Sequence, residues 1–237
     1  MTVEDAEQVV RGIGAVLVGV IWAVAAVGAA RALRRPAGRA MGVATRGGPL
    51  VAYLLAGVPY LLVCIALWHP LPTQPAGTTR VACLVVGSAL GAAGAGLYLW
   101  GRAALGDMYN VSSSLGSGLF ADHRLVVSGP YRFVRHPMYL GIVLGVVGAL
   151  LVYRTWATLF MVLALPGLVM KARHEDRLLG EQLDGPFDDY RARVPAWMPR
   201  PARADDREEP GRPQAGETGL EGSRREGRRR PLAMGDG

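Results

Sequence analysis

The sequence GPYRFVRHPMYLG, residues 129–141, places two prolines immediately before a long apolar run. Proline fixes its own φ and disfavours helix in the residue before it, so Pro130 and Pro137 predict a stiff, non-helical approach. Proline also suits the first position of a helix, where its missing N–H is not needed. The pattern therefore predicts a helix that begins at about residues 136–138.

The predicted helix start carries the cationic or potentially cationic side chains Arg132, Arg135 and His136. Free backbone N–H groups and the positive end of the helix dipole favour an anion at such a position. A carboxylate or a phosphate is therefore a candidate ligand. A second interpretation stays open, because arginines beside a membrane helix also serve as cytoplasmic anchors.

Along the rest of the chain, apolar residues gather in long runs and charged residues lie in the gaps between them, as in a polytopic membrane protein. We expect membrane segments at 12–30, 49–68, 81–100, 139–152 and 156–170. Pro59 predicts a kink in the second segment. The last two are short for a bilayer of about 30 Å, so they form either a spanning hairpin or one that only enters the membrane. A cleaved signal peptide is the alternative for the first run.

The sequence thus predicts an all-α integral membrane protein with about five transmembrane segments, including a short C-terminal helical hairpin. A short segment at 1–11 precedes a membrane domain at 12–200, whose residues 171–200 form a cytoplasmic motif segment. The tail at 201–237 is rich in Arg, Gly and Pro and is predicted to be disordered. Basic loops after the first and third runs place the N-terminus outside and the C-terminus in the cytoplasm.

The net charge of +7 comes almost wholly from arginine. Because these arginines cluster at helix ends, they favour contact with membrane lipids, and we expect no nucleic-acid partner. Cys64 and Cys83 lie inside apolar runs, which favours small buried side chains over a disulfide or a metal site.

A second motif follows the hairpin, KARHEDRLLGEQLDGPFDDYRARVPAWMP at 171–199. Leu178, Leu179 and Leu183 fall on one helical face, which predicts an amphipathic helix at the cytoplasmic interface. Taken alone, Glu175 and Asp176 would form a solvated acidic face paired with neighbouring arginines.

The two motifs together resemble the isoprenylcysteine carboxyl methyltransferase family and its phospholipid methyltransferase relatives. The resemblance covers residues 105–199 and rests on the spacing of identical or similar residues. The first motif matches Gly-Pro-Tyr followed by Arg-His-Pro-x-Tyr-x-Gly; the second keeps an acidic pair, Leu179, Tyr190 and a following Arg-Val-Pro. Leu183 and Asp184 depart from the family's Phe-Gly, and Phe187 departs from its first Tyr.

This resemblance implies an integral-membrane methyltransferase that uses S-adenosylmethionine and holds it with a cytoplasmic segment. It implies that Arg135 and Glu175 are the catalytic residues, with Arg135 and Arg193 binding the substrate. No metal is implied. The residues that the resemblance assigns to the cofactor are His136, Pro137, Tyr139, Gly141, Glu175, Asp176 and Tyr190.

The implied acceptor is lipophilic, and carboxyl methylation of an isoprenylcysteine-like or isoprenoid acid is the first expectation. A prenylated substrate, a phospholipid amine and a small thiol remain alternatives within the same class. A sterol-reductase-like membrane oxidoreductase and a non-enzymatic scaffold or transporter are alternatives from other classes. The oligomeric state does not follow from the sequence.

Overall fold

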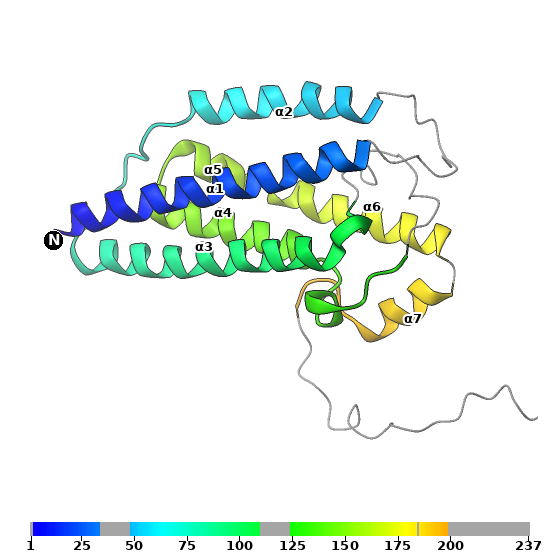
Figure 1. Cartoon of the computed structure of the whole chain (residues 1–237). Helices are drawn as coiled ribbons and strands as arrows, with labels where there is room; N and C mark the ends of the chain where they lie inside the picture. Colours follow the sequence, from blue (N-terminus) through cyan, green and yellow to red (C-terminus); the bar gives the residue numbers. More distant parts are fainter. Residues whose placement is uncertain (1, 34–47, 110–123, 184, 199–237) are drawn as a thin grey trace, which may run out of the picture. The chain divides into compact units, whose positions relative to one another are not determined.

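The computed structural model describes residues 2–33, 48–109, 124–183 and 185–198, and the regular elements in these ranges are all helical (Figure 1). A lone bridge between Pro70 and Thr155 is the sole β-type pairing in this part of the chain. The elements are α1 (Val3–Leu33), α2 (Gly48–Ala66), α3 (Gly77–Leu105), η1 (Gly106–Met108), η3 (Gly129–Arg132), α4 (Pro137–Tyr153), α5 (Trp156–Leu163), α6 (Leu165–Gln182) and α7 (Pro186–Arg193).

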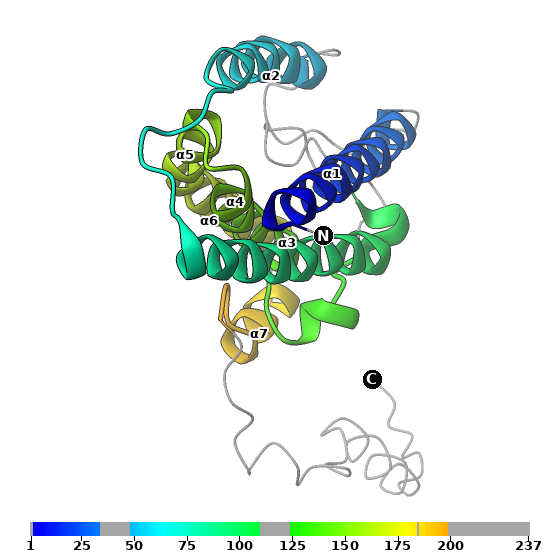
Figure 2. The same ribbon diagram turned by 90° about the vertical axis from the view of Figure 1, so that its left-hand side faces the viewer.

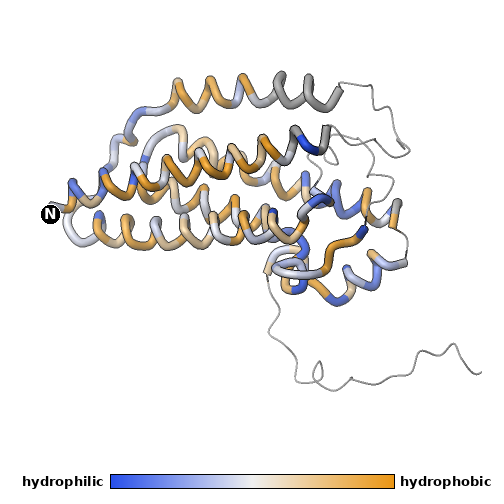
Figure 3. The backbone as a smooth tube through the Cα atoms, viewed as in Figure 1, coloured by the Kyte–Doolittle hydropathy of each residue, from blue (hydrophilic) through white to orange (hydrophobic). Residues whose placement is uncertain are grey.

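Within the described residues, three helical stretches are long and apolar enough to cross a membrane: Val3–Gly28, Gly77–Met108 and Trp156–Glu181. Two shorter apolar stretches, Gly57–Ala66 and Pro137–Tyr153, accompany them. Figure 3 shows the apolar residues running along these helices and hydrophilic residues along α7 and the end of α6. The predicted class, an all-α integral membrane protein, is confirmed.

Helices α3 and α4 form the most extensive helix contact in the described part of the chain, and glycines of both helices lie in it (Figure 2). A Cβ atom at Gly94 would lie 2.5 Å from the carbonyl oxygen of Gly141, and one at Gly148 would lie 2.6 Å from that of Gly87. Only glycine lets two helix backbones approach so closely. This contact fixes the start of α4 against the end of α3, where the candidate site lies.

Helix α1 begins at Val3, well before the predicted membrane segment at 12–30. The Thr2 hydroxyl accepts a hydrogen bond from the Asp5 backbone N–H at 3.2 Å, and the Asp5 carboxylate accepts one from the Thr2 N–H at 2.7 Å. This reciprocal pair is a capping box with Asp in place of the usual Glu. The segment predicted at 1–11 is therefore mostly the first turns of α1.

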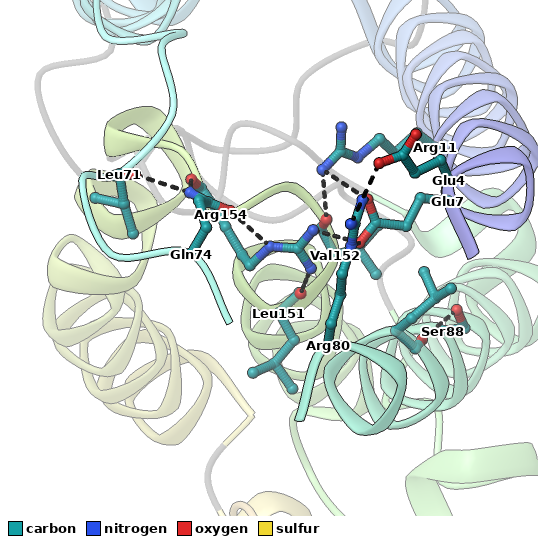
Figure 4. A network of polar contacts seen from close by, with 11 residues as sticks. Glu4, Glu7, Arg11, Leu71, Gln74, Arg80, Ser88, Leu151, Val152 and Arg154 are labelled. Atoms are coloured by element: carbon teal, nitrogen blue, oxygen red, sulfur yellow. Dashed lines mark hydrogen bonds and ion pairs between the residues drawn. The ribbon is translucent and has the colours of Figure 1, made fainter. Parts of the chain in front are cut away.

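The polar residues of those turns enter a buried ion network (Figure 4). The Glu7 carboxylate contacts Arg154 and lies 2.9 Å from Arg80 Nη2 and 3.6 Å from Arg11 Nη2. Arg154 Nε also donates to Gln74 Oε1 at 3.0 Å. A single buried carboxylate thus ties α1 to the start of α3 and to the turn after α4.

The turn after α4 joins the hairpin at the predicted residues Tyr153, Arg154 and Thr155. Arg154 caps α4 in the left-handed conformation, with φ at 52°. Thr155 then caps α5 through reciprocal hydrogen bonds with Thr158. The loop before α3 binds this turn through backbone hydrogen bonds, including Leu71 N–H to the Arg154 carbonyl at 2.9 Å.

The second arm of the hairpin differs from the prediction in two respects. It breaks at Ala164, between α5 and α6, because Pro166 has no N–H with which to continue the ladder. It then extends to Gln182, so the predicted segment at 156–170 and the start of the amphipathic helix are one long arm. Glu175 and Asp176 therefore lie on α6, a helix that begins in the apolar part of the hairpin.

Some predictions lie outside the described residues. These are the disordered tail at 201–237 and most of the basic loop after the first membrane segment, at 34–47.

Candidate functional site

The first motif is held against the end of α3. Gly129 has φ at +62°, and a Cβ atom there would lie 3.0 Å from Ala104 Cβ and 3.4 Å from Trp100 Nε1. Pro130 and Tyr131 are buried within η3, and α4 then begins at Pro137 with His136 as its N-cap residue. The predicted stiff approach and helix start are both present.

The second motif folds back onto the first. The backbone N–H of Arg135 donates to the Pro195 carbonyl at 2.9 Å, and that of His136 donates to the Ala196 carbonyl at 3.1 Å. The Tyr190 hydroxyl donates to the Tyr131 carbonyl at 2.7 Å. We call residues 194–198 the C-terminal strap. Two segments that are far apart in sequence therefore meet at the start of α4.

The charged centre of this meeting point is Asp176, on α6. Its Oδ1 atom lies 2.9 Å from His136 Nε2, and its Oδ2 atom lies 3.1 Å from Arg135 Nη2. The side chains of Asp176 and Arg135 are only 18% and 12% exposed. Two donor atoms of Arg135, Nε and Nη1, are buried and have no hydrogen-bond partner among the described residues. Such donors are costly unless a ligand accepts from them.

A cavity of about 450 Å³ opens at this centre, within the range typical of small-molecule sites. The His136 ring stacks on Tyr139 with centroids 5.5 Å apart and lies 5.8 Å from Trp197 of the strap. The cavity therefore combines cationic, acidic, aromatic and apolar walls. Its lining residues are Arg135, His136, Val169, Ala172, Arg173, Asp176, Ala196 and Trp197.

Of the residues predicted from the sequence, Arg135, His136 and Asp176 are brought together in this cavity. Glu175 is half-buried and does not line it. Arg193 is exposed and its Nε donates to the Asp189 carbonyl at 3.1 Å.

Three further predicted residues do not line the cavity. Pro137 is fully buried at the first position of α4, and Tyr139 lies against His136. Gly141 belongs to the contact between α3 and α4.

Trp197 is a cavity residue that sequence reasoning missed. It is a lone aromatic two residues after the matched Arg-Val-Pro, and only that register marks it. Its position follows from the backbone hydrogen bonds that fasten the strap to residues 135 and 136.

The two buried tyrosines of the site stay protonated at neutral pH. Burial raises the pKa of the Tyr131 phenol above its usual range, and the negative charge of Glu175 raises it further. Burial raises the pKa of Tyr190 to about 12, against a lowering effect of Arg135. Both phenols therefore stay neutral, and the Tyr190 hydroxyl donates its proton to the hydrogen bond with the Tyr131 carbonyl.

The fold and the site define a helical integral membrane protein whose polar cavity lies at the ends of its membrane helices. Within it, residues 82–181 match the model of the phospholipid methyltransferase family, which includes isoprenylcysteine carboxyl methyltransferase-like proteins. This match confirms the resemblance noted in the sequence. Residues 82–181 are thus similar to membrane methyltransferases, a family that generally uses S-adenosylmethionine.

The chain is also similar to the nickel-cobalt-cadmium resistance protein NccN of Alcaligenes xylosoxydans xylosoxydans. The two are 40% identical over 79 residues, which cover 32% of this chain and 36% of that protein. The similarity therefore spans only about a third of the relative.

Proposed function

We propose that this protein transfers a methyl group from S-adenosylmethionine to the carboxyl group of a lipophilic acid, such as an isoprenylcysteine-like or isoprenoid acid. The observation that carries the proposal is the cavity in which Arg135, with two buried unpaired donors, faces Asp176 and His136 at the start of α4. Both motifs of the resemblance contribute to it, and the family match covers most of it.

The cavity residues fit the chemical groups of the cofactor. The unpaired Nε and Nη1 atoms of Arg135 and the positive end of α4 suit its carboxylate. Asp176 suits its ammonium group, and the aromatic faces of His136 and Trp197 suit a planar base. Asp176 already fixes Arg135 and His136 in place, so little reorganisation is needed on binding.

When bound, the cofactor supplies an electrophilic methyl group on a sulfonium. The protein then has to position and orient the cofactor and the acceptor and to exclude water, since methyl transfer is an in-line displacement at carbon. The strap contributes Ala196 and Trp197 to the cavity wall and is fastened to residues 135 and 136 by backbone hydrogen bonds. Glu175 and Arg135 remain our candidates for the residues most tied to catalysis, and Arg193 for a contact with the substrate.

Methyl transfer tests the proposal directly. Membranes containing the full chain are given the tritiated-methyl cofactor and a panel of acceptors: prenylated cysteine acids, long-chain acids, phosphatidylethanolamine and small thiols. We expect label in base-labile methyl esters, a loss of at least about 100-fold in Arg135→Ala, and wild-type rates in the control Arg191→Ala, an exposed arginine. Undiminished transfer by Arg135→Ala would remove the assignment.

A phospholipid amine is the second candidate acceptor, because the matching family is named for phospholipid methyltransferases. Label in base-stable choline-type products in place of esters would support this acceptor. The name of the similar protein refers to nickel, cobalt and cadmium resistance. In the described part of this chain, no three His, Cys, Asp or Glu residues gather as a metal site.

We further propose that the site faces the cytoplasm, with the N-terminus outside, as the arginine distribution predicts. The cavity lies at the end of α3 and the start of α4, next to the arginine-rich segment 124–135. Reporter fusions at the C-terminus and in the loop before α3 test the orientation. An active periplasmic reporter at the C-terminus would overturn it.

A further inference from the structure

The two consecutive acids of α6 face different surroundings. Asp176 contacts Arg135 and His136 in the cavity. Glu175 does not line the cavity, and its charge, after burial, raises the pKa of Tyr131. Consecutive helical residues point about 100° apart, so the two carboxylates serve different sides of the helix. A second polar region therefore adjoins the cavity on the side of Glu175.

Arg102, near the end of α3, is the cation of this second region. Its guanidinium lies 4.1 Å from the centroid of the Tyr109 ring, and its Nη1 donates to the Gly106 carbonyl at 3.0 Å. Its Nε is buried and has no hydrogen-bond partner among the described residues. The charge of Arg102 also lowers the pKa of Tyr131, against the larger raising effect of burial. The guanidinium thus lies over an aromatic ring with one donor left unused.

Helix α1 approaches this pair at a glycine. A Cβ atom at Gly28 would lie 2.7 Å from Arg102 Nη2 and 2.9 Å from Tyr109 Cε1. Gly28 is itself buried. Since α1 is one of the long apolar helices, the unused donor lies where a membrane helix meets the polar end of α3.

We propose that Arg102 binds the carboxylate of the methyl acceptor, in a subsite shaped by Tyr109 and Gly28. This proposal rests on the methyltransferase function proposed above and names the residue that selects an acid. A guanidinium suits a carboxylate because its planar fork donates to both oxygens, and stacking on a ring orients the fork. An acid with an apolar tail also fits the setting, because its head would reach Arg102 while its tail stays among membrane helices.

A tyrosine pair connects the two regions. The hydroxyl of Tyr190 donates to the carbonyl of Tyr131 at 2.7 Å. Arg135 and Asp176 influence the pKa of Tyr190, and Glu175 and Arg102 influence that of Tyr131. The hydrogen bond between the tyrosines therefore links the side of the cavity to the side of Arg102.

The chemistry balances without a base. A carboxylate oxygen of the acceptor forms the new O–CH₃ bond while the S–CH₃ bond breaks and its electron pair stays on sulfur. The products are a methyl ester and a neutral thioether, and no proton moves. The product ester carries no negative charge, so Arg102 binds it more weakly than the acid. Loss of this contact favours release of the product.

Equilibrium binding to the full chain in nanodiscs tests this inference without relying on turnover. The probes are tritiated N-acetyl-S-farnesylcysteine and palmitic acid, each beside its methyl ester, and the tritiated cofactor. The variants are Arg102→Gln, Arg102→Lys and Gly28→Ala. Arg132→Gln is the matched control, because Arg132 is an exposed arginine that likewise lies over a ring, 4.4 Å from the centroid of Phe133.

We expect wild-type protein to bind at least one acid more tightly than its ester. Arg102→Gln should weaken the binding of that acid by about 10- to 100-fold and leave the binding of its ester and of the cofactor unchanged. Arg102→Lys should keep part of the preference, Gly28→Ala should reduce it, and Arg132→Gln should leave it intact.

Equal binding of acid and ester by wild-type protein would overturn the inference, as would unchanged acid binding by Arg102→Gln. Parallel loss of acid, ester and cofactor in both Arg102 variants would also overturn it, because that marks a structural role. If wild-type protein prefers the acid but does not bind the cofactor, the proposed methyltransferase function fails while the Arg102 subsite stands.

Discussion

The Glu7→Gln substitution tests the buried network that attaches α1 to the rest of the membrane domain. Glu7 has a side chain only 4% exposed and contacts three arginines (Figure 4). The most buried of these is Arg154, at 8% exposed. Glutamine keeps the shape of Glu7 and one oxygen acceptor but removes its charge. Arg154 is then left as a buried cation without a counter-charge.

The magnitude follows from that burial. Removing one partner of a buried ion pair costs about 3–5 kcal/mol, and the retained amide oxygen places this change at the lower end. Stability changes of about 3 kcal/mol move the thermal midpoint of a chain this size by about 6–12 °C. Glu4→Gln is the matched control: Glu4 is 77% exposed and lies 3.6 Å from Arg80, so its loss should change the midpoint little.

The assay is thermal unfolding of detergent-solubilised protein, followed by near-ultraviolet circular dichroism. A double variant, Glu7→Gln with Arg154→Gln, should be clearly more stable than the sum of the two single losses predicts, because it removes both charges together. Equal midpoints for Glu7→Gln and Glu4→Gln, or strict additivity in the double variant, would refute the reasoning.

Further predictions concern the cavity, the helix contact and the buried tyrosines. Asp176→Asn should weaken binding of labelled cofactor by about 10-fold or more, whereas the exposed Asp188→Asn should not. Gly94→Ala should destabilise the protein by about 1–3 kcal/mol, since the new methyl would lie 2.5 Å from a carbonyl oxygen of α4. Gly96→Ala, which meets nothing within 4 Å, should not, and thermal unfolding compares the two. Because the folded pKa of Tyr190 is raised to about 12, its contribution to stability is present below about pH 10 and lost as the pH rises through 12. Tyr190→Phe should flatten that part of the alkaline unfolding profile.

The features that the sequence predicts well are local. Pro137 requires a helix start because its ring fixes φ and lacks a donor, and α4 begins there. The joint at Tyr153, Arg154 and Thr155 interrupts an apolar run, and the hairpin turns at those residues. Gly87, Gly91 and Gly94 give the third apolar run a small-residue surface that favours close helix packing, and Gly94 meets α4. Each of these inferences needs only a few neighbouring residues.

The features that the sequence does not predict depend on distant partners. Glu7 is one acid in a short polar stretch, and Arg154, its most buried partner, follows it by 147 residues. Nothing within the first turns of α1 marks Glu7 as buried. The earlier helix start was nonetheless readable, because Thr2 and Asp5 have the spacing of a capping box.

The acidic pair of α6 has a local feature, its spacing, which the sequence predicts, and distant partners, which it does not. The spacing identifies Glu175 and Asp176 together, and the resemblance favours Glu175 as the catalytic acid. In the structure Asp176 is the acid that contacts Arg135. On a helix, residues four apart share a face, whereas consecutive residues cannot. A consecutive pair therefore suits the two ligands that we propose: Asp176 would serve the cofactor, and Glu175, whose charge raises the pKa of Tyr131, would lie on the side of Arg102. The same proposal uses the buried donors left without a hydrogen-bond partner among the described residues, which are Nε and Nη1 of Arg135 and Nε of Arg102.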